Sequence, residues 1–224
     1  MEWESGDVRL ICGDALEWLR SLPDGVANCC VTSPPYYGLR DYGVTGQIGL
    51  EASPEEYTAR LVAIFGEVRR VLRDDGTLWL NLGDSYNGSG KGGVFSEASA
   101  KQATNEGANI SKPMRLDSLK PKDLIGIPWR VAFALQADGW YLRQDIIWAK
   151  PNPMPESVTD RCTKSHEYVF MLSKSARYYY DQDAIRLPHT ENWAGQTMGG
   201  ALKPCSTYAL DAKTPTAHVR QERP

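Results

Sequence analysis

The stretch from Val26 to Tyr36 constrains the fold of this chain more than any other part of its 224 residues. The apolar run Val26–Val31 is rich in small and β-branched residues and follows an Asp-Gly turn signal, which predicts a fully buried strand. Thr32-Ser33-Pro34-Pro35-Tyr36 then forms a loop at the carboxyl end of that strand, where open α/β sheets bind their ligands. Its two prolines fix φ and lack N–H donors, so the loop presents carbonyl acceptors between a hydroxyl group and an aromatic ring.

Such a loop suits a planar ring that carries an amino group. The ring can stack on Tyr36 while its N–H groups donate to the Ser33 hydroxyl and the Pro34 carbonyl. The alternative is an ordinary loop, because prolines often end strands. These five residues by themselves leave both interpretations open.

Strand and helix patterns alternate along the rest of the chain, which predicts an α/β fold that opens with a compact β-α-β unit. Ser53-Pro54-Glu55-Glu56 is a capping-box signature and predicts the start of a helix that Asp74-Asp75-Gly76 stops. Pro128 marks either a kink or the first turn of a second helix within the segment 121–135. The expected strands are Val8–Cys12, Val26–Val31, Leu78–Leu82, Tyr141–Trp148 and Tyr168–Leu172, with a possible sixth at Tyr178–Tyr180, and Asp14 is expected to cap a helix that runs to about Leu19.

Two polar segments interrupt this pattern. Residues 84–120 contain hardly any aliphatic cluster and predict a long mobile loop, which is either a DNA-contacting loop or a disordered insertion. Residues 189–224 show little periodicity and predict a tail that is poorly ordered or in need of a partner.

The formal net charge of −3 hides an asymmetry along the chain. Residues 1–99 carry 8 Lys and Arg against 15 Asp and Glu, whereas residues 100–224 carry 17 against 13. A duplex partner would be held by positive side chains on its phosphates, although a solvated face is the simpler interpretation of any single one of them. The candidates are Lys101, Lys112, Arg115, Lys120, Lys122, Arg143, Lys150, Arg161 and Lys164.

Composition excludes several other classes of protein. No apolar run approaches the length of a membrane span, and the acidic start lacks the basic region of a signal peptide, so we expect a cytoplasmic protein. The five cysteines lack Cys-x-x-Cys spacing and are interpreted as reduced core thiols. With three scattered histidines, no metal site is expected.

Thr32-Ser33-Pro34-Pro35-Tyr36 after a buried strand resembles the catalytic motif of the amino-methylating DNA methyltransferases, which transfer methyl from S-adenosyl-L-methionine to cytosine N4 or adenine N6. The resemblance covers roughly residues 8 to 186, and its pieces are specific together where each alone is weak. Their order is similar to that of the permuted members, in which the catalytic half precedes the cofactor half. The matching segments are Leu10–Ala15 with Leu22–Asp24, Gly76–Tyr86, Gly139-Trp140, Ile147–Asn152 and His166–Tyr168.

The resemblance implies the catalytic half of a Rossmann-like methyltransferase sheet with long loop insertions. It implies that Ser33, Pro34, Pro35 and Tyr36 are catalytic: the Ser33 hydroxyl and the Pro34 carbonyl accept the two amino hydrogens of a base flipped out of double-stranded DNA, and Tyr36 stacks on it. Because stacking needs only the ring, Tyr36→Phe is predicted to be mild. Members with Ser at this position commonly methylate cytosine N4, so cytosine is favoured over adenine N6.

The resemblance also implies roles for several single residues outside this loop. Asp14 resembles the acidic residue near the cofactor's adenine or ribose and is the one cofactor-binding candidate, while a helix N-cap is an equally good interpretation of it. Lys150 and Asn152 are candidates for contact with DNA or with the flipped base. His166 and Glu167 match the family pattern and are expected to serve in packing.

The sequence departs from the family in one respect. The Phe-x-Gly-x-Gly loop that cradles the cofactor, and the acidic residue that follows it, are not found, so we expect residues 1–188 to be the catalytic half and residues 189–224 the start of a target-recognition region. A natural truncation, a split gene and a fragment are all compatible with this pattern. The expected partners are DNA and a second chain that supplies the missing half, with self-association through an exposed apolar edge. A non-catalytic DNA- or partner-binding remnant and an RNA- or protein-modifying methyltransferase are the alternative functions.

Overall fold

The computed structural model describes residues 2–88, 115–153, 155–156 and 158–186. Residues 1–180 form one compact unit and residues 181–224 belong to a second. The predictions for the tail 189–224 and for most of the 84–120 loop lie outside the described residues. In the part of the chain that the structure describes, no helix combines the length and apolar character needed to cross a membrane.

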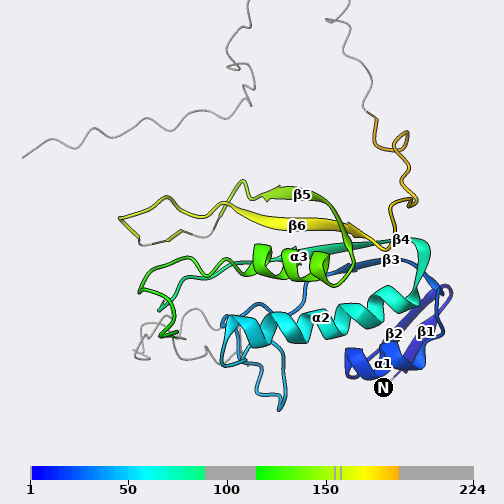
Figure 1. Ribbon diagram of the computed structural model, residues 1–224, viewed down its shortest axis with the longest axis horizontal. Coiled ribbons are helices and arrows are strands. Elements are labelled where there is room, and N and C mark those ends of the chain that lie inside the picture. Colours follow the sequence, from blue (N-terminus) through cyan, green and yellow to red (C-terminus); the bar gives the residue numbers. More distant parts are fainter. Residues whose placement is uncertain (1, 89–114, 154, 157, 187–224) are drawn as a thin grey trace, which may run out of the picture. The chain divides into compact units, whose positions relative to one another are not determined.

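A four-stranded sheet forms the centre of the first unit (Figure 1). Its strands are β3 (Ala27–Thr32), β4 (Leu72–Leu82), β5 (Tyr141–Ala149) and β6 (His166–Ser173), in the spatial order β3-β4-β6-β5. β3 is parallel to β4, and β6 is antiparallel to both β4 and β5. β3, β4 and β5 therefore run in the same direction, and their carboxyl ends lie at one edge of the sheet together with the start of β6.

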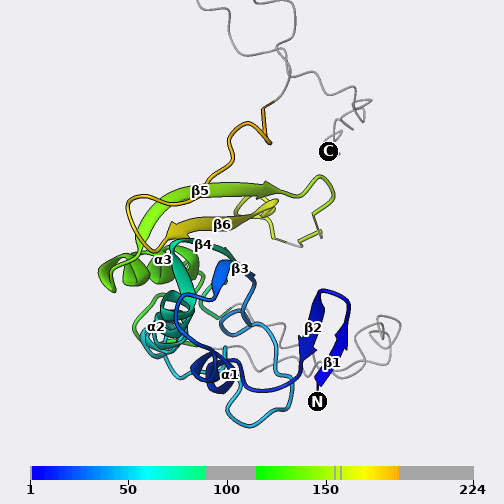
Figure 2. The same cartoon turned by 90° about the vertical axis from the view of Figure 1, so that its right-hand side faces the viewer.

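Two helices, α2 (Pro54–Val71) and α3 (Ile127–Ala137), pack on the same face of this sheet (Figures 1 and 2). The period of two along a strand directs alternate residues of β4 and β6 toward the helices. Those residues form one core with the apolar stripes of the helices, and fully burying each such side chain contributes about 1.5–3 kcal/mol. Central members of the core are Leu78, Leu80, Leu82, Phe170 and Leu172 from the strands and Tyr57, Leu61, Phe65, Val131 and Leu135 from the helices.

The capping-box prediction for α2 is confirmed. The Ser53 hydroxyl accepts a hydrogen bond from the Glu56 N–H at 3.1 Å, and the Glu56 carboxylate accepts one from the Ala52 N–H at 3.1 Å. The predicted end is wrong, because α2 stops at Val71 and β4 begins directly at Leu72. Leu72 takes up an extended conformation and buries its side chain in the core, so the Asp74-Asp75-Gly76 turn signal lies inside β4.

The N-terminal strand exists, but the predicted β-α-β opening is wrong. β2 (Val8–Ile11) pairs with β1 (Glu2–Ser5) in a separate antiparallel sheet. Every residue of both strands is exposed, so β2 has no buried face with which to join the central sheet. Helix α1 (Ala15–Ser21) follows, and Asp14 caps it as predicted.

β3 is not the fully buried strand that its composition predicted. It is an edge strand with β4 as its one neighbour in the described sheet, and Val31 is 78% exposed. The four described cysteines are correspondingly not core thiols: Cys12, Cys29 and Cys162 are exposed and Cys30 is half-buried, while Cys205 lies outside the described residues. The apolar run reflects a sheet face that α2 and α3 do not cover.

Two further predictions are corrected. Tyr178–Tyr180 form no strand, although the Tyr179 N–H donates to the Asp75 carbonyl at 3.0 Å. The described ends of the 84–120 loop are tied together rather than loose, because the amide of Asn87, which is 1% exposed, donates to three carbonyls of residues 116–120 and accepts the Leu116 N–H at 2.8 Å.

The ambiguity at Pro128 is resolved in favour of a helix start. α3 begins at Ile127 with Pro128 in its first turn, where a missing N–H is tolerated. No side chain of its own segment caps this helix. Instead Asp84 Oδ1, from the loop after β4, accepts the N–H groups of Gly126 and Ile127, both at 3.0 Å.

Candidate functional site

A cluster of polar side chains lies where β3 and β4 reach the carboxyl edge of the sheet. Parallel pairing of Thr32 with Leu80 puts Ser33, the first residue beyond β3, next to Asn81. The Ser33 hydroxyl is 3.2 Å from Asn81 Oδ1 and 3.2 Å from the Tyr36 hydroxyl. The Tyr36 hydroxyl donates to Asn81 Oδ1 at 2.7 Å. The Thr-Ser-Pro-Pro-Tyr loop is thus tied to β4 by hydrogen bonds from the hydroxyl groups of Ser33 and Tyr36.

β5 and β6 extend this cluster. Antiparallel pairing of Asn81 on β4 with Val169 on β6 places Glu167 on the same face of the sheet as Asn81. Glu167 Oε2 is 3.2 Å from the Tyr36 hydroxyl, and Glu167 Oε1 forms an ion pair with Lys150, the first residue after β5. The five residues Ser33, Tyr36, Asn81, Lys150 and Glu167 are called the edge network below.

Electrostatics of the edge network keep Glu167 charged. Partial burial acts to raise the pKa of Glu167, but hydrogen bonds from Lys150, Asn81 and Tyr36 and the charge of Lys150 outweigh it, so this pKa lies below the ordinary value. Burial raises the pKa of Tyr36, and the negative charge of Glu167 adds to the rise although the Ser33 hydrogen bond opposes it. At neutral pH the network contains a carboxylate and a neutral phenol.

Close packing holds the loop that carries Ser33. The Tyr57 hydroxyl on α2 donates to the Pro35 carbonyl at 2.9 Å. The Tyr36 ring lies against Gly83, where a Cβ would come within 2.5 Å of the ring. Gly49 (φ 101°) passes equally close to the Tyr36 carbonyl, which a Cβ would meet at 2.7 Å. No described residue donates a hydrogen bond to the Pro34 carbonyl, the acceptor that the sequence assigned to the substrate.

The structure brings some of the predicted site residues together and leaves others apart. Ser33 and Tyr36 share the edge network, whereas Asp14 hydrogen-bonds to the Leu16 and Glu17 N–H groups of its own helix, at 2.9 and 3.0 Å. The N-cap interpretation of Asp14 is therefore confirmed. Its capping bonds use Oδ1, and the residue is exposed, so its second oxygen can still accept a hydroxyl group.

Sequence reasoning missed two members of the network. Asn81 carried a signal, since a polar residue interrupts an otherwise apolar strand pattern at that position. Glu167 was assigned to packing and is instead hydrogen-bonded to Tyr36 and paired with Lys150. His166 does pack, with its ring edge-on to Tyr168 at 5.2 Å. Asn152 is exposed in the loop after β5.

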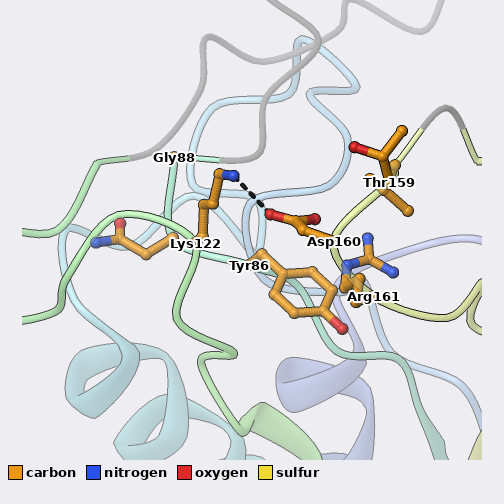
Figure 3. A pocket seen from close by; sticks show the side chains of 8 residues that line it. Tyr86, Gly88, Lys122, Thr159, Asp160 and Arg161 are labelled. Carbon is orange, nitrogen blue, oxygen red and sulfur yellow. Dashed lines mark hydrogen bonds and ion pairs between the residues drawn. The ribbon is translucent and has the colours of Figure 1, made fainter.

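A cavity of about 470 Å³ lies beside the loops that follow β4 and β5, and Figure 3 shows its lining. Lys122 forms an ion pair with Asp160 at 2.6 Å, and the Arg161 guanidinium lies 4.1 Å from the centre of the Tyr86 ring. Arg161 also pairs with Glu156 at 2.5 Å. Together with Lys150, which pairs with Glu167, three of the cations proposed to contact DNA phosphates therefore have carboxylate partners within the chain.

Acceptor groups at the carboxyl edge of a mixed sheet, with helices on one face, describe the binding edge of an α/β fold. The fold is similar to the solved structure of the PvuII DNA methyltransferase (cytosine-N4-specific), with a TM-score of 0.51 and 18% identity over 75% of this chain and 50% of that one. The chain belongs to the family of N6/N4 DNA methylases, whose sequence profile matches residues 27–208.

Curated relatives support this assignment. The chain is 57% identical to the type II methyltransferase M.Cfr9I of Citrobacter freundii over 183 residues, and 54% identical to M.SmaI of Serratia marcescens over 184 residues. Each match covers 82% of this chain, but 60% of the first relative and 61% of the second. The chain therefore spans about three fifths of the length of these relatives.

Proposed function

We propose that this chain carries the acceptor site of a DNA amino-methyltransferase, which transfers a methyl group from S-adenosyl-L-methionine to the exocyclic amine of a base flipped out of double-stranded DNA. The observation that carries this proposal is the fixed orientation of the Ser33 hydroxyl within the edge network. Membership of the N6/N4 DNA methylase family supports it.

The network prepares Ser33 to accept a hydrogen bond. Its single proton is directed to Asn81 Oδ1 or to the Tyr36 oxygen, so its lone pairs are left for the amine of the substrate. Asn81 cannot present its amide nitrogen instead, because that nitrogen donates to the Tyr168 carbonyl at 3.1 Å. Ser33 and the Pro34 carbonyl can then accept both amino hydrogens, which returns the lone pair to the nitrogen and stabilises its developing charge.

Cytosine N4 is our favoured target atom, because the resemblance associates Ser at position 33 with cytosine. Adenine N6 uses the same acceptor chemistry and is the alternative. The face of the Tyr36 ring that does not lie against Gly83 is our candidate for the surface on which either base stacks.

S-adenosyl-L-methionine supplies a methyl group that its sulfonium centre activates toward a weak nucleophile. Among the described residues, Asp14 is the candidate for a hydroxyl group of this cofactor, through the carboxylate oxygen that the α1 cap leaves available. One carboxylate oxygen is a small part of such a site. We infer that further polypeptide completes it.

The edge strand β3 offers a place where this further polypeptide can pair with the sheet. Its outer backbone groups have no strand partner among the described residues, and Val26 and Val31 are 55% and 78% exposed, which favours pairing with another strand. A second chain that carries the cofactor loop can supply this strand and complete the cofactor site. Another copy of this chain can pair with the same edge but does not bring that loop. We further propose that the chain acts in the cytoplasm as part of a restriction-modification system. In this proposal residues 1–188 are the catalytic half and residues 189–224 are the start of a target-recognition region.

The proposed function is tested by incubating the chain with labelled S-adenosyl-L-methionine and duplex DNA, followed by nucleoside analysis. N4-methylcytosine is the expected product, and Ser33→Ala should lower its rate by about 100-fold, by analogy with the loss of one oriented group at an oxyanion. Ser21→Ala, on α1, is the matched control. DNA binding without methylation would favour the non-catalytic alternative, and full activity of Ser33→Ala would end the motif-based mechanism.

The proposed role of β3 is tested by size-exclusion chromatography. The chain is expected to elute as more than a monomer, with weak binding of S-adenosyl-L-methionine in calorimetry, and Val31→Lys should shift it toward the monomer because an edge charge opposes strand pairing. A stable monomer that binds the cofactor tightly would contradict the inferred second polypeptide.

A further inference from the structure

The hydroxyl groups of Ser33 and Tyr36 form a continuous chain that ends at a carboxylate. Ser33 Oγ is 3.2 Å from the Tyr36 hydroxyl oxygen, which is 3.2 Å from Glu167 Oε2. Ser33 is exposed and Tyr36 and Glu167 are partly buried, so the chain leads from the accessible end of the site inward. Asn81 also touches both hydroxyls, but a neutral amide oxygen is a hydrogen-bond acceptor and not a useful base.

We propose that Ser33, Tyr36 and Glu167 form a proton relay that removes the proton released when the amine of the substrate is methylated. The proposal rests on the proposed function, because it concerns the same reaction. It makes Glu167 a proton acceptor that acts through Tyr36 and Ser33, which neither the motif nor the family match assigns.

With this relay, every bond, proton and charge of the methyl transfer is accounted for. The amine nitrogen forms a bond to the methyl carbon while the carbon–sulfur bond breaks, and the bonding pair stays on sulfur. The nitrogen now carries a positive charge and gives one proton to Ser33 Oγ. Ser33 passes its own proton to the Tyr36 oxygen. The single Tyr36 proton turns from Asn81 Oδ1 toward Glu167 Oε2 and is passed to that carboxylate. The products are the neutral thioether, a neutral methylated amine and a protonated Glu167.

Charges around Glu167 suit a resting carboxylate. Lys150, after β5, pairs with its other oxygen, and Lys164, in the segment before β6, contributes a second positive charge. Tyr36 faces it from the loop after β3. Glu167 does not need to be a strong base, since the lone pair of a methylated arylamine is delocalised into the ring and its ammonium form gives up a proton readily. Transfer of this kind typically contributes 10²–10⁴-fold to a rate.

The decisive variant is Glu167→Gln, because glutamine can still accept the Tyr36 hydrogen bond but cannot take up the proton. Its single-turnover methylation rate should fall by about 100-fold with little change in KM. The methylation rate of Tyr36→Phe should fall by a similar factor, contrary to the mild effect predicted from stacking. The variant that carries both substitutions should be no slower than either single variant. Glu67→Gln on α2 is the matched control, since its side chain is 27% exposed against 22% for Glu167 and is likewise paired with a cation.

Chemical rescue separates proton transfer from a structural role. Glu167→Ala should regain activity when formate is added, because a small carboxylate can occupy the vacated space and accept the proton. Loss of activity without rescue would overturn the relay, as would a normal rate for Glu167→Gln. An inactive wild-type chain would instead count against the proposed function.

A titration that needs no activity tests the relay independently. With ¹³C-labelled tyrosine, the pKa of Tyr36 should fall in Glu167→Gln, because the negative charge that helps to raise it is removed, and should not change in Glu67→Gln. An unchanged pKa of Tyr36 in Glu167→Gln would show that the two groups are not coupled, and would overturn the relay.

Discussion

Replacement of Gly83 by alanine tests whether the position of the Tyr36 ring determines both stability and activity. A Cβ at this position would lie 2.5 Å from Cε2 and 2.6 Å from Cδ2 of Tyr36. Favourable carbon–carbon contacts lie near 3.5–4.0 Å, so the ring must retreat by about 1 Å. It cannot do so freely, because its hydroxyl is held at 2.7 Å from Asn81 Oδ1 and 3.2 Å from Glu167 Oε2.

The size of the effect follows from these contacts. Overpacking costs about 1–3 kcal/mol, and weakening a hydrogen bond adds about 1 kcal/mol. We therefore expect Gly83→Ala to lower the free energy of unfolding by about 2–4 kcal/mol, measured by denaturant titration. A 1 Å displacement within a catalytic constellation can cost about 100-fold in rate, which gives the expected loss of methylation.

A double-mutant cycle isolates the cause. In a Tyr36→Ala background the ring is gone, so adding Gly83→Ala should change stability by no more than about 0.5 kcal/mol. Gly66→Ala on α2 is the control, because a Cβ there meets nothing within 4 Å and alanine favours a helix over glycine by about 1 kcal/mol. If the penalty of Gly83→Ala persists without the Tyr36 ring, the steric reasoning is wrong.

Three other variants test separate parts of the fold. Asp84→Ala removes the acceptor for N–H groups at the start of α3 and should destabilise the chain by about 2 kcal/mol in denaturant titration; a neutral result would contradict the capping role. The buried Tyr37 hydroxyl has no hydrogen-bond partner among the described residues. Tyr37→Phe should therefore raise the free energy of unfolding by about 1 kcal/mol, seen as a higher melting temperature, and a large loss of stability would contradict the absence of a partner. Burial, with a smaller contribution from the neighbouring Cys29, raises the pKa of Cys30 from 9.0 to about 11. As pH rises the unfolded chain therefore loses this proton before the folded chain does, and stability falls between pH 9 and 11. Cys30→Ala should flatten this decline relative to the wild-type chain, and equal slopes in the two would refute the reasoning.

Local sequence determined the elements whose signals are complete within a few residues. The caps at Asp14 and Ser53 decide where α1 and α2 begin, because the side chain that accepts the first N–H groups is adjacent in sequence. The face of α2 that joins the core is likewise a local property, because its apolar residues recur at helical spacing. The Ser33 loop could be recognised for the same reason, since all of its functional groups lie in five consecutive residues.

Tertiary structure decided everything that depends on pairing over long separations. An apolar run does not specify how many neighbours a strand has, so β3 was predicted as buried and lies at an edge, while β2 pairs with the preceding strand rather than with the central sheet. The cap of α3 could not be predicted, because Asp84 is more than forty residues from the N–H groups it accepts. Glu167 joins the site for the same kind of reason: β6 lies antiparallel beside β4, and this pairing brings a carboxylate to a tyrosine 131 positions earlier in the chain.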